Sequence, residues 1–191
     1  MRDSRAVEAV LGDERVPVLR LFVGIDLPPE IKLQLATLCA GVPEARWVDA
    51  GNLHLTLRFI GEVDEGVASD IDAALVRLSA PRFTLALAGV GQFGTRMLWI
   101  GVEKSPELLQ LQTRVESALQ RAGIPPETRR FTPHVSLARL RPPLGPKVRA
   151  FVEANAAFRA EPFPVRQFKL VASYLTKSGA IYEDQADYPL D

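Results

Sequence analysis

The 191-residue sequence contains only one cysteine and two histidines. The lone cysteine, Cys39, cannot form a disulfide within the chain, which excludes the disulfide-rich secreted domains. It ends the apolar run IKLQLATLC, where we expect a buried thiol in a reducing compartment, the cytoplasm. The two histidines, His54 and His134, have no Cys or carboxylate at ligand spacing, whereas a zinc site needs three or four ligands. We therefore expect no metal and no cofactor.

Long apolar segments and an excess of either charge are also missing. No run approaches the ~18 residues of a membrane span, and residues 1–18 are too charged for the core of a signal peptide, so we interpret them as an N-terminal extension. Twenty-three basic residues balance 23 acidic ones. This balance argues against a broad phosphate-tracking surface of the kind that binds duplexes without specificity. Any contact with nucleic acid should be local.

Residues 19–191 have the composition of a globular domain, since 47% of the chain is hydrophobic and 24% is charged. Apolar residues recur with the strand period of two in some segments and with the helical period in others. Strands are predicted at residues 19–26, 52–61, 83–93, 97–103, 134–140 and 165–175, and helices at residues 31–41, 64–79, 105–122 and 148–156. The segment KSGAIYE predicts a hairpin turn that leads to a last strand.

Both histidines stand in the same local pattern, His-x-[Ser/Thr]-Leu, within HLTLRF and HVSLAR. Chance would produce this coincidence on the order of once in 10,000 chains of this composition. The histidines are 80 residues apart, and the strands that open each half are offset by about 77, from Leu21 to Leu98. Residues 19–95 and 96–191 therefore form tandem half-units, each with the order strand, helix, histidine strand, helix, strand.

Two such units predict an α+β fold. We expect a bilobal molecule with two pseudo-symmetric lobes and antiparallel sheets around a central cleft. Equivalent strands would present equivalent residues toward the pseudo-two-fold axis. His54 and His134 should therefore face each other across one cleft.

Alternation along the first histidine strand places His54, Thr56 and Arg58 on one face. The residues between them share the opposite face, toward the core: Leu53, Leu55, Leu57 and Phe59.

On the second histidine strand, His134 and Ser136 share a face with Ala138. Arg139 should then point away from His134, unless the strand is bulged or ends there.

A histidine with a hydroxyl, present twice, suits in-line displacement at phosphorus. One neutral imidazole takes a proton from water, the other gives a proton to the departing oxygen, and the hydroxyls of Thr56 and Ser136 bind the non-bridging oxygens. A single strand histidine is more often a surface or core residue, and a strand threonine is often only a good β-former. Recurrence in both half-units favours catalysis.

The two motifs resemble those of the 2H phosphoesterase superfamily, and within it the RNA 2′,3′-cyclic phosphodiesterases long called 2′-5′ RNA ligases. The segments RLFVGIDLP, NLHLTLRFIGEV, GQF before MLWIGV, and RFTPHVSLARL are similar to family segments in order and spacing. The resemblance covers Leu19 to Tyr182. It implies the 2H phosphoesterase fold, metal-independent opening of 2′,3′-cyclic phosphate ends of RNA or nucleotides to 2′-phosphates, and 2′-5′ ligation as the reverse reaction.

Carried over residue by residue, the resemblance implies that His54 and His134 are the catalytic pair and that Thr56 and Ser136 hold the phosphate. Family members often have Thr at the position of Ser136, and the hydroxyl is kept. The family's division of labour makes His54 the acid that protonates the ribose 3′ oxygen and His134 the base, although the residue pattern itself is symmetric. Arg139 matches the arginine that closes the second motif, which is implicated in binding the nucleotide.

Other candidates for nucleotide contacts lie nearby. Arg58 shares the predicted face of His54, with a rim or surface charge as the alternative. The segment RRFTPHVSLARLR concentrates Arg129, Arg130, Arg139 and Arg141, and this cluster is a candidate landing site for RNA phosphates or else solvated charge.

Aromatic residues near the cleft could stack a base, as is common in the binding of single-stranded RNA. Phe22 and Phe131 are the candidates, with core packing as the alternative for each. Trp47 and Trp99 are assigned to packing.

Two other functions stay open at this point. The same four residues would serve another cyclic or 2′-5′ linked phosphodiester, such as ADP-ribose cyclic phosphate or 2′-5′ oligoadenylate, because pocket walls set that choice. A non-catalytic RNA-binding module is the other alternative, against which the intact histidines and hydroxyls argue. We expect a monomer that acts on RNA or a nucleotide with a 2′,3′-cyclic phosphate, away from membranes.

Overall fold

The computed structural model describes residues 18–176 and 179–191. The elements, in chain order, are β1 (Val18–Asp26), α1 (Pro29–Leu38), β2 (Ala45–Trp47), the 3-10 helix η1 (Ala50–Asn52), β3 (His54–Asp64), α2 (Glu65–Val76), β4 (Phe83–Leu85), β5 (Leu87–Phe93), β6 (Met97–Val102), α3 (Pro106–Arg121), β7 (His134–Leu140), α4 (Pro146–Ala154), β8 (Phe163–Val165), β9 (Gln167–Leu175) and β10 (Ala180–Pro189). In the described ranges, no helix is both long and apolar enough to span a membrane.

One sheet runs through the whole molecule. Its strands follow the order β10-β9-β1-β3-β7-β6-β5, with β2 also paired to β7, and all the pairings are antiparallel. The two histidine strands, β3 and β7, meet at the centre, where Leu55 pairs with Val135. Both side chains are fully buried. The predicted α+β architecture with antiparallel sheets is confirmed.

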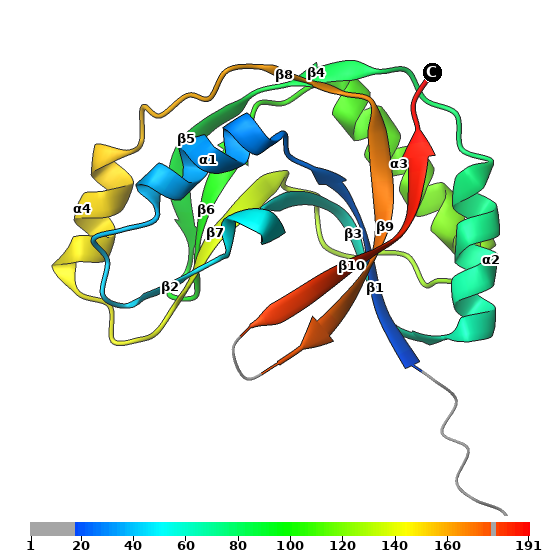
Figure 1. The fold of residues 1–191 in the computed structure, drawn as a ribbon, viewed down its shortest axis with the longest axis horizontal. Helices are drawn as coiled ribbons and strands as arrows, with labels where there is room; N and C mark the ends of the chain where they lie inside the picture. Colours follow the sequence, from blue (N-terminus) through cyan, green and yellow to red (C-terminus); the bar gives the residue numbers. More distant parts are fainter. Residues whose placement is uncertain (1–17, 177–178) are drawn as a thin grey trace, which may run out of the picture.

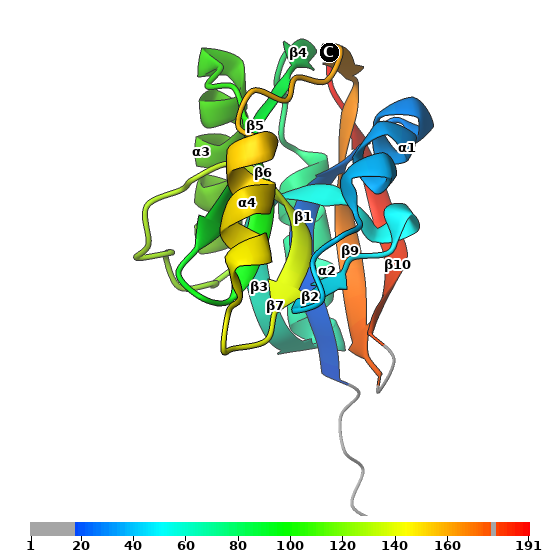
Figure 2. The ribbon, with the colours of Figure 1, turned by 90° about the vertical axis from the view of Figure 1, so that its left-hand side faces the viewer.

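On each side of the central β3–β7 pair, the sheet contains strands from both halves of the sequence. Strand β5 pairs with β6 of the second half, β9 pairs with β1 of the first half, and β4 pairs with β8. The helices are exchanged in the same way, because α3 packs against α2 and contacts β3. Helices α2 and α3 lie together at one end of the molecule, and α1 and α4 lie toward the other (Figure 1). Figure 2 shows α4 in front of the β5–β7 side of the sheet. A pseudo-two-fold axis between β3 and β7 accounts for this exchange.

Two predictions about strands are wrong, and one strand was missed. The segment 83–93 is two strands, because β4 leaves the main sheet at Ala86 to pair with β8. The segment 165–175 is likewise divided at Arg166 between β8 and β9. Strand β2 was not predicted, since three residues are too few to show a period.

Other predicted features hold with changed boundaries. Strands β9 and β10 pair as a hairpin from Leu175 and Ala180, while residues 177–178 of its turn and residues 1–17 of the predicted extension lie outside the described residues. Helix α1 ends at Leu38, earlier than the expected Gly41. Cys39 follows directly, half-buried, with its thiol 3.3 Å from the carbonyl oxygen of Leu35, and burial raises its pKa.

Candidate active site

The pairing of β3 with β7 brings the two motifs together. Continuing the antiparallel register by one residue on each side of the central pair places His54 opposite Ser136 and Thr56 opposite His134. All four lie on the face opposite the buried central pair. The two imidazoles are then diagonal neighbours, with their Cβ atoms about 7 Å apart. A phosphate group fits between two histidines and two hydroxyls in this arrangement.

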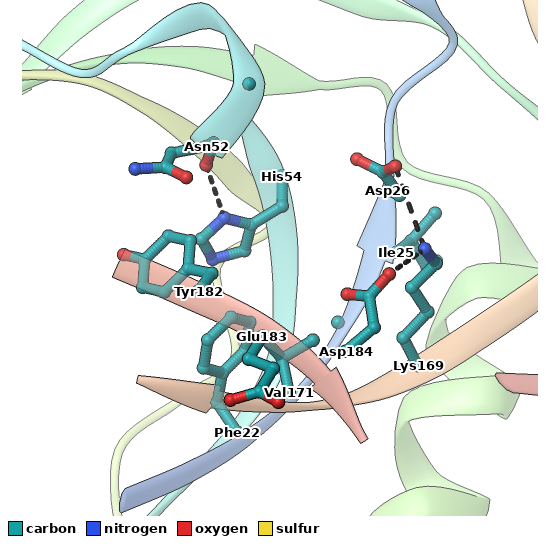
Figure 3. A pocket seen from close by; sticks show the side chains of 12 residues that line it. Phe22, Ile25, Asp26, Asn52, His54, Lys169, Val171, Tyr182, Glu183 and Asp184 are labelled. Carbon is teal, nitrogen blue, oxygen red and sulfur yellow. Dashed lines mark hydrogen bonds and ion pairs between the residues drawn. The ribbon is translucent and has the colours of Figure 1, made fainter. Parts of the chain in front are cut away.

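His54 is held by a backbone carbonyl and two aromatic rings (Figure 3). Its Nδ1 lies 2.7 Å from the carbonyl oxygen of Asn52, which can only accept, so Nδ1 carries the proton and Nε2 has the free lone pair. Nε2 lies 3.1 Å from Oγ1 of Thr56. The ring stacks on Phe22 with centroids 4.6 Å apart and meets Tyr182 edge-on at 5.2 Å. These contacts fix both the tautomer and the ring plane.

His134 is held in the equivalent way. Its Nδ1 lies 2.7 Å from the carbonyl oxygen of Thr132, and its ring meets Phe93 edge-on with centroids 4.9 Å apart. The hydroxyl of Ser136 donates to the sulfur of Met97 at 3.2 Å. Because sulfur is a weak acceptor, this hydroxyl can turn to a phosphate oxygen at little cost.

The pKa of His54 is shifted downward. Burial is the main cause, since it disfavours the imidazolium form. The hydrogen bond to the Asn52 carbonyl and the charge of Asp26 oppose the shift, whereas the charge of Lys32 adds to it. A bound phosphate anion would oppose the shift further and favour the protonated ring.

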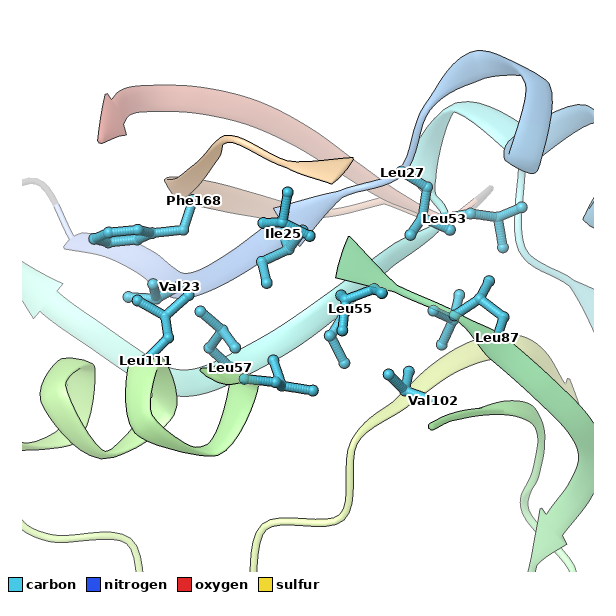
Figure 4. Close-up of a cluster of buried hydrophobic side chains, with 14 of the residues drawn as sticks. Val23, Ile25, Leu27, Leu53, Leu55, Leu57, Leu87, Val102, Leu111 and Phe168 are labelled. Carbon is cyan, nitrogen blue, oxygen red and sulfur yellow. The ribbon is translucent and has the colours of Figure 1, made fainter. Parts of the chain in front are cut away.

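A β-bulge follows the hydroxyl of each motif. The register of β3 against β1 slips by one residue at Leu57, and the register of β7 against β6 slips at Leu137, 80 residues later. Leu57 faces the buried cluster together with Leu53 and Leu55 (Figure 4). Each bulge inverts the alternation of the residues that follow it.

The first bulge overturns the predicted positions of Arg58 and Phe59. Arg58 does not share the face of His54. It is 8% exposed and forms an ion pair with Glu116 of α3 at 2.7 Å. Phe59 was assigned to the core, yet it is 38% exposed on the open face of the sheet. Arg58 is therefore not free to bind a nucleotide.

The second bulge places Arg139 on the face of His134, whereas in a strand without a bulge it would lie on the opposite face. Its neighbours Ala138 and Leu140 are buried, whereas Arg139 is exposed. Its charge acts on the hydroxyl of Tyr182. The pKa of Tyr182 is raised because burial outweighs the opposing charges of Arg139 and Arg20. Arg139 thus points to the same side as the imidazoles.

Two pockets flank the histidine pair. The His54 pocket has a volume of about 430 Å³, and its charged lining residues are Asp26, Lys169, Glu183 and Asp184 (Figure 3). The His134 pocket has a volume of about 460 Å³ and also includes Thr56. Its wall combines aromatic rings with charged side chains of both signs: Phe59, Phe93, Phe131, Arg58, Arg129, Arg130, Glu116 and Glu127. The two sides of the phosphate position therefore differ in chemistry.

The remaining candidates divide between the site and the core. Phe131 and Arg130 line the His134 pocket. Phe22 is 4% exposed beneath His54, so it packs against the imidazole and offers no open face to a base. Trp47 packs on Phe151 with centroids 5.4 Å apart, as assigned.

Trp99 packs on Phe93 with centroids 5.1 Å apart, also as assigned to packing. Sequence reasoning missed Phe59, Phe93 and Tyr182, because a bulge or a distant strand brings each of them to the cleft. Among the residues that the structure describes, no group of three His, Cys, Asp or Glu side chains could hold a metal ion.

Comparison with known proteins places this geometry in a family. The model of the 2′-5′ RNA ligase superfamily matches residues 28–176. The chain belongs to this superfamily. An RNA 2′,3′-cyclic phosphodiesterase of Archaeoglobus fulgidus is 31% identical over 173 residues, which cover 87% of this chain and 97% of the relative. One of Thermotoga maritima is 32% identical over 175 residues, covering 86% and 92%.

A solved structure of this superfamily shows the same fold. Escherichia coli LigT, crystallised with 3′-AMP, superposes with a TM-score of 0.75 at 32% identity, covering 91% of this chain and 99% of LigT. The expected 2H phosphoesterase fold and membership of the 2′-5′ RNA ligase superfamily are thereby confirmed.

Proposed function

We propose that this chain hydrolyses 2′,3′-cyclic phosphate ends of RNA to 2′-phosphates. The observation that carries the proposal is the diagonal pair of imidazoles. Each has Nδ1 bound to a carbonyl oxygen, so that Nε2 is left for the space between Thr56 and Ser136. The named relatives, which are RNA 2′,3′-cyclic phosphodiesterases, support the substrate class.

The reaction is an in-line displacement at phosphorus. One imidazole takes a proton from water as the water oxygen bonds to phosphorus, and the other gives its Nε2 proton to the ribose 3′ oxygen as that P–O bond breaks. The hydroxyls of Thr56 and Ser136 donate hydrogen bonds to the non-bridging oxygens, where negative charge builds. The products are a 2′-phosphate and a 3′-hydroxyl.

We assign the acid to His54 and the base to His134, following the family's division of labour. Burial lowers the pKa of His54, which makes its imidazolium form a ready proton donor, while the substrate's negative charge favours protonation once it is bound.

The nucleoside belongs in the His134 pocket. Phe59 and Phe93 are each 38% exposed there, and exposed rings suit base stacking. Arg130 lies in the same wall, where it can meet an RNA phosphate. Arg139, exposed on β7, is a second candidate for such a contact. The His54 pocket has three carboxylates against one lysine, whereas the His134 pocket has three arginines against two carboxylates, so the His134 side is the more favourable one for a polyanion.

Both histidines and both hydroxyls come from a single chain, so the site needs no residue of a second subunit, and we propose a monomer. The same machinery can form a 2′-5′ linkage when a 5′-hydroxyl takes the place of water as the nucleophile, since the bond to the 3′ oxygen breaks in the same way. The single free thiol supports the cytoplasm as the compartment.

The test uses RNA that ends in a 2′,3′-cyclic phosphate, incubated in EDTA with the parent, His54→Ala or His134→Ala. We expect a 2′-phosphate from the parent and a rate at least ~100-fold lower for each variant, the usual scale of acid-base catalysis. A substrate with sulfur at the 3′ bridging position should restore the acid variant selectively, because a thiolate leaves without a proton.

Turnover that survives both substitutions would exclude the proposal. Binding without turnover by the parent would favour a non-catalytic module. Turnover of ADP-ribose cyclic phosphate or 2′-5′ oligoadenylate in place of the RNA would redirect the assignment to those diesters.

A further inference from the structure

Arg58 is bonded at every guanidinium nitrogen. It stands on β3 two residues after Thr56, and its Nε donates to Oε2 of Glu116 at 2.7 Å. Nη2 donates to the carbonyl oxygen of Pro125 at 2.6 Å, and Nη1 donates to the carbonyl oxygen of Phe59. A buried arginine with three separate acceptors holds those acceptors in a fixed geometry.

Glu116 connects Arg58 to the loop of residues 125–133. Its Oε1 accepts the backbone N–H of Glu127 at 2.9 Å and the side-chain amide of Gln120 at 3.1 Å. Burial acts to raise the pKa of Glu116, but the hydrogen bonds from Glu127, Gln120 and Arg58 outweigh it and the pKa is lowered. The carboxylate is therefore charged. Arg58 fixes the loop directly at Pro125, and at Glu127 both through Glu116 and through its own ion pair at 3.9 Å.

This loop, residues 125–133, leads directly into the second motif. It contains no helix or strand, and Arg129, Arg130 and Phe131 from it line the His134 pocket. Its Thr132 carbonyl binds Nδ1 of His134. The ion pair of Arg129 with Glu127 lies within the loop, so it cannot tie the loop to the sheet.

The second half of the chain has no counterpart to Arg58. The equivalent position, 80 residues later, is the fully buried Ala138, and the arginine of that motif, Arg139, stands one position further on. The loop before His54 is fixed differently, by Lys32, which donates to the Gly51 carbonyl at 2.9 Å. The tether therefore serves His134 alone.

We propose that Arg58 is a positioning residue for His134. By fixing Pro125 and Glu127, it sets the Thr132 carbonyl that determines the tautomer of His134, together with the wall of the His134 pocket. The inference rests on the proposed function for its kinetic consequences, whereas the geometry of His134 can be tested without any activity.

The test compares Arg58→Met and Arg58→Lys with Arg82→Met as the matched control. Arg82 also donates to a backbone carbonyl, that of Leu190 at 3.0 Å, at the end of the chain. Because the chain has only two histidines, nitrogen-15 NMR of the imidazoles resolves each ring, and a His54→Gln background assigns them. Tautomer, kcat, KM and the pH profile of kcat are measured.

We expect Arg58→Met to lower the Nδ1–H tautomer fraction of His134, to leave that of His54 unchanged, and to lower kcat by tenfold or more, since small displacements of a catalytic group are costly. Arg58→Lys keeps the positive charge but loses the planar guanidinium with its several donors. Its tautomer fraction and kcat should therefore lie between those of the parent and Arg58→Met. Arg82→Met should match the parent in both rings and in kcat.

A folded Arg58→Met protein with an unchanged His134 tautomer and a kcat within twofold of the parent would overturn the proposal. Equal changes in the tautomer fractions of His54 and His134 would also overturn the proposal, because they would indicate a general loss of structure and not a local effect on His134. If Arg58→Met does not fold, Arg58→Lys and Glu116→Gln carry the same readouts. A parent without activity on cyclic phosphate ends would reject the proposed function, and the NMR comparison would still decide the role of Arg58.

Discussion

The chemistry of each histidine depends on a backbone atom that no sequence motif records. His54 and His134 each bind the carbonyl two residues upstream, that of Asn52 and that of Thr132. Because every residue has a carbonyl, the side-chain types at these positions carry no signal. The residue pattern therefore identified the imidazoles and hydroxyls, but it could not identify what fixes their tautomers.

The lowered pKa of His54 also affects stability. Above the unfolded pKa of about 6.5, both states leave the ring neutral. Between that value and the lower folded pKa, only the unfolded chain binds the proton, so the free energy of unfolding falls as pH falls. Urea unfolding at pH 7.5, 6.5 and 5.5 should show the parent losing stability faster than His54→Gln, by at most about 1.4 kcal/mol per pH unit. Parallel losses in the two proteins would contradict this assignment.

At the scale of the element, the two bulges decide which arginine lies on the face of the imidazoles. The sequences HLTLRF and HVSLAR place their arginines one position apart, and strict alternation assigned Arg58 to the cleft and Arg139 away from it. The slips at Leu57 and Leu137 reverse both assignments. A bulge is a property of pairing with a neighbouring strand, so the period of one strand cannot reveal it.

Strand β6 supports the second motif by close backbone approach. Gly101 pairs with His134, and a Cβ added there would lie 2.6 Å from the carbonyl oxygen of Ala88. Because a backbone oxygen must shift to admit it, Gly101→Ala should lower the free energy of unfolding by about 1–3 kcal/mol. Gly51→Ala, where a Cβ meets open space, serves as the control. Equal denaturant midpoints for the two variants would contradict this prediction. They would show that the backbone at Ala88 moves away from position 101 without loss of stability.

At the scale of the whole molecule, the internal repeat was visible and its assembly was not. The matched motifs predicted the fold class and the facing histidines, because repetition at a fixed offset is a sequence property. The pairings of β5 with β6 and of β9 with β1 join opposite halves of the sequence. In the pairings of β1 with β3 and of β6 with β7, Asp26 lies opposite His54 and Gly101 lies opposite His134, an offset of 75 residues in place of the expected 77. Such long-range registers depend on packing and leave no local pattern.

The balanced charge of the molecule leads to a last prediction, about salt. Binding to single-stranded RNA weakens with salt by a log–log slope of about −0.7 for each phosphate neutralised. Arg129 is already paired with Glu127 at 2.9 Å, an interaction that lowers the pKa of Glu127 to about 2. In the described structure, Arg130 has no ion-pair partner, so Arg130→Gln should reduce the slope by about 0.7 while Arg129→Gln changes it little. The salt dependence of RNA binding by each variant can be measured by fluorescence anisotropy of a labelled RNA, in the His54→Ala background to prevent turnover. Equal effects of both substitutions would mean that the Glu127 pair opens when RNA binds, and that the loop held by Arg58 rearranges around its substrate.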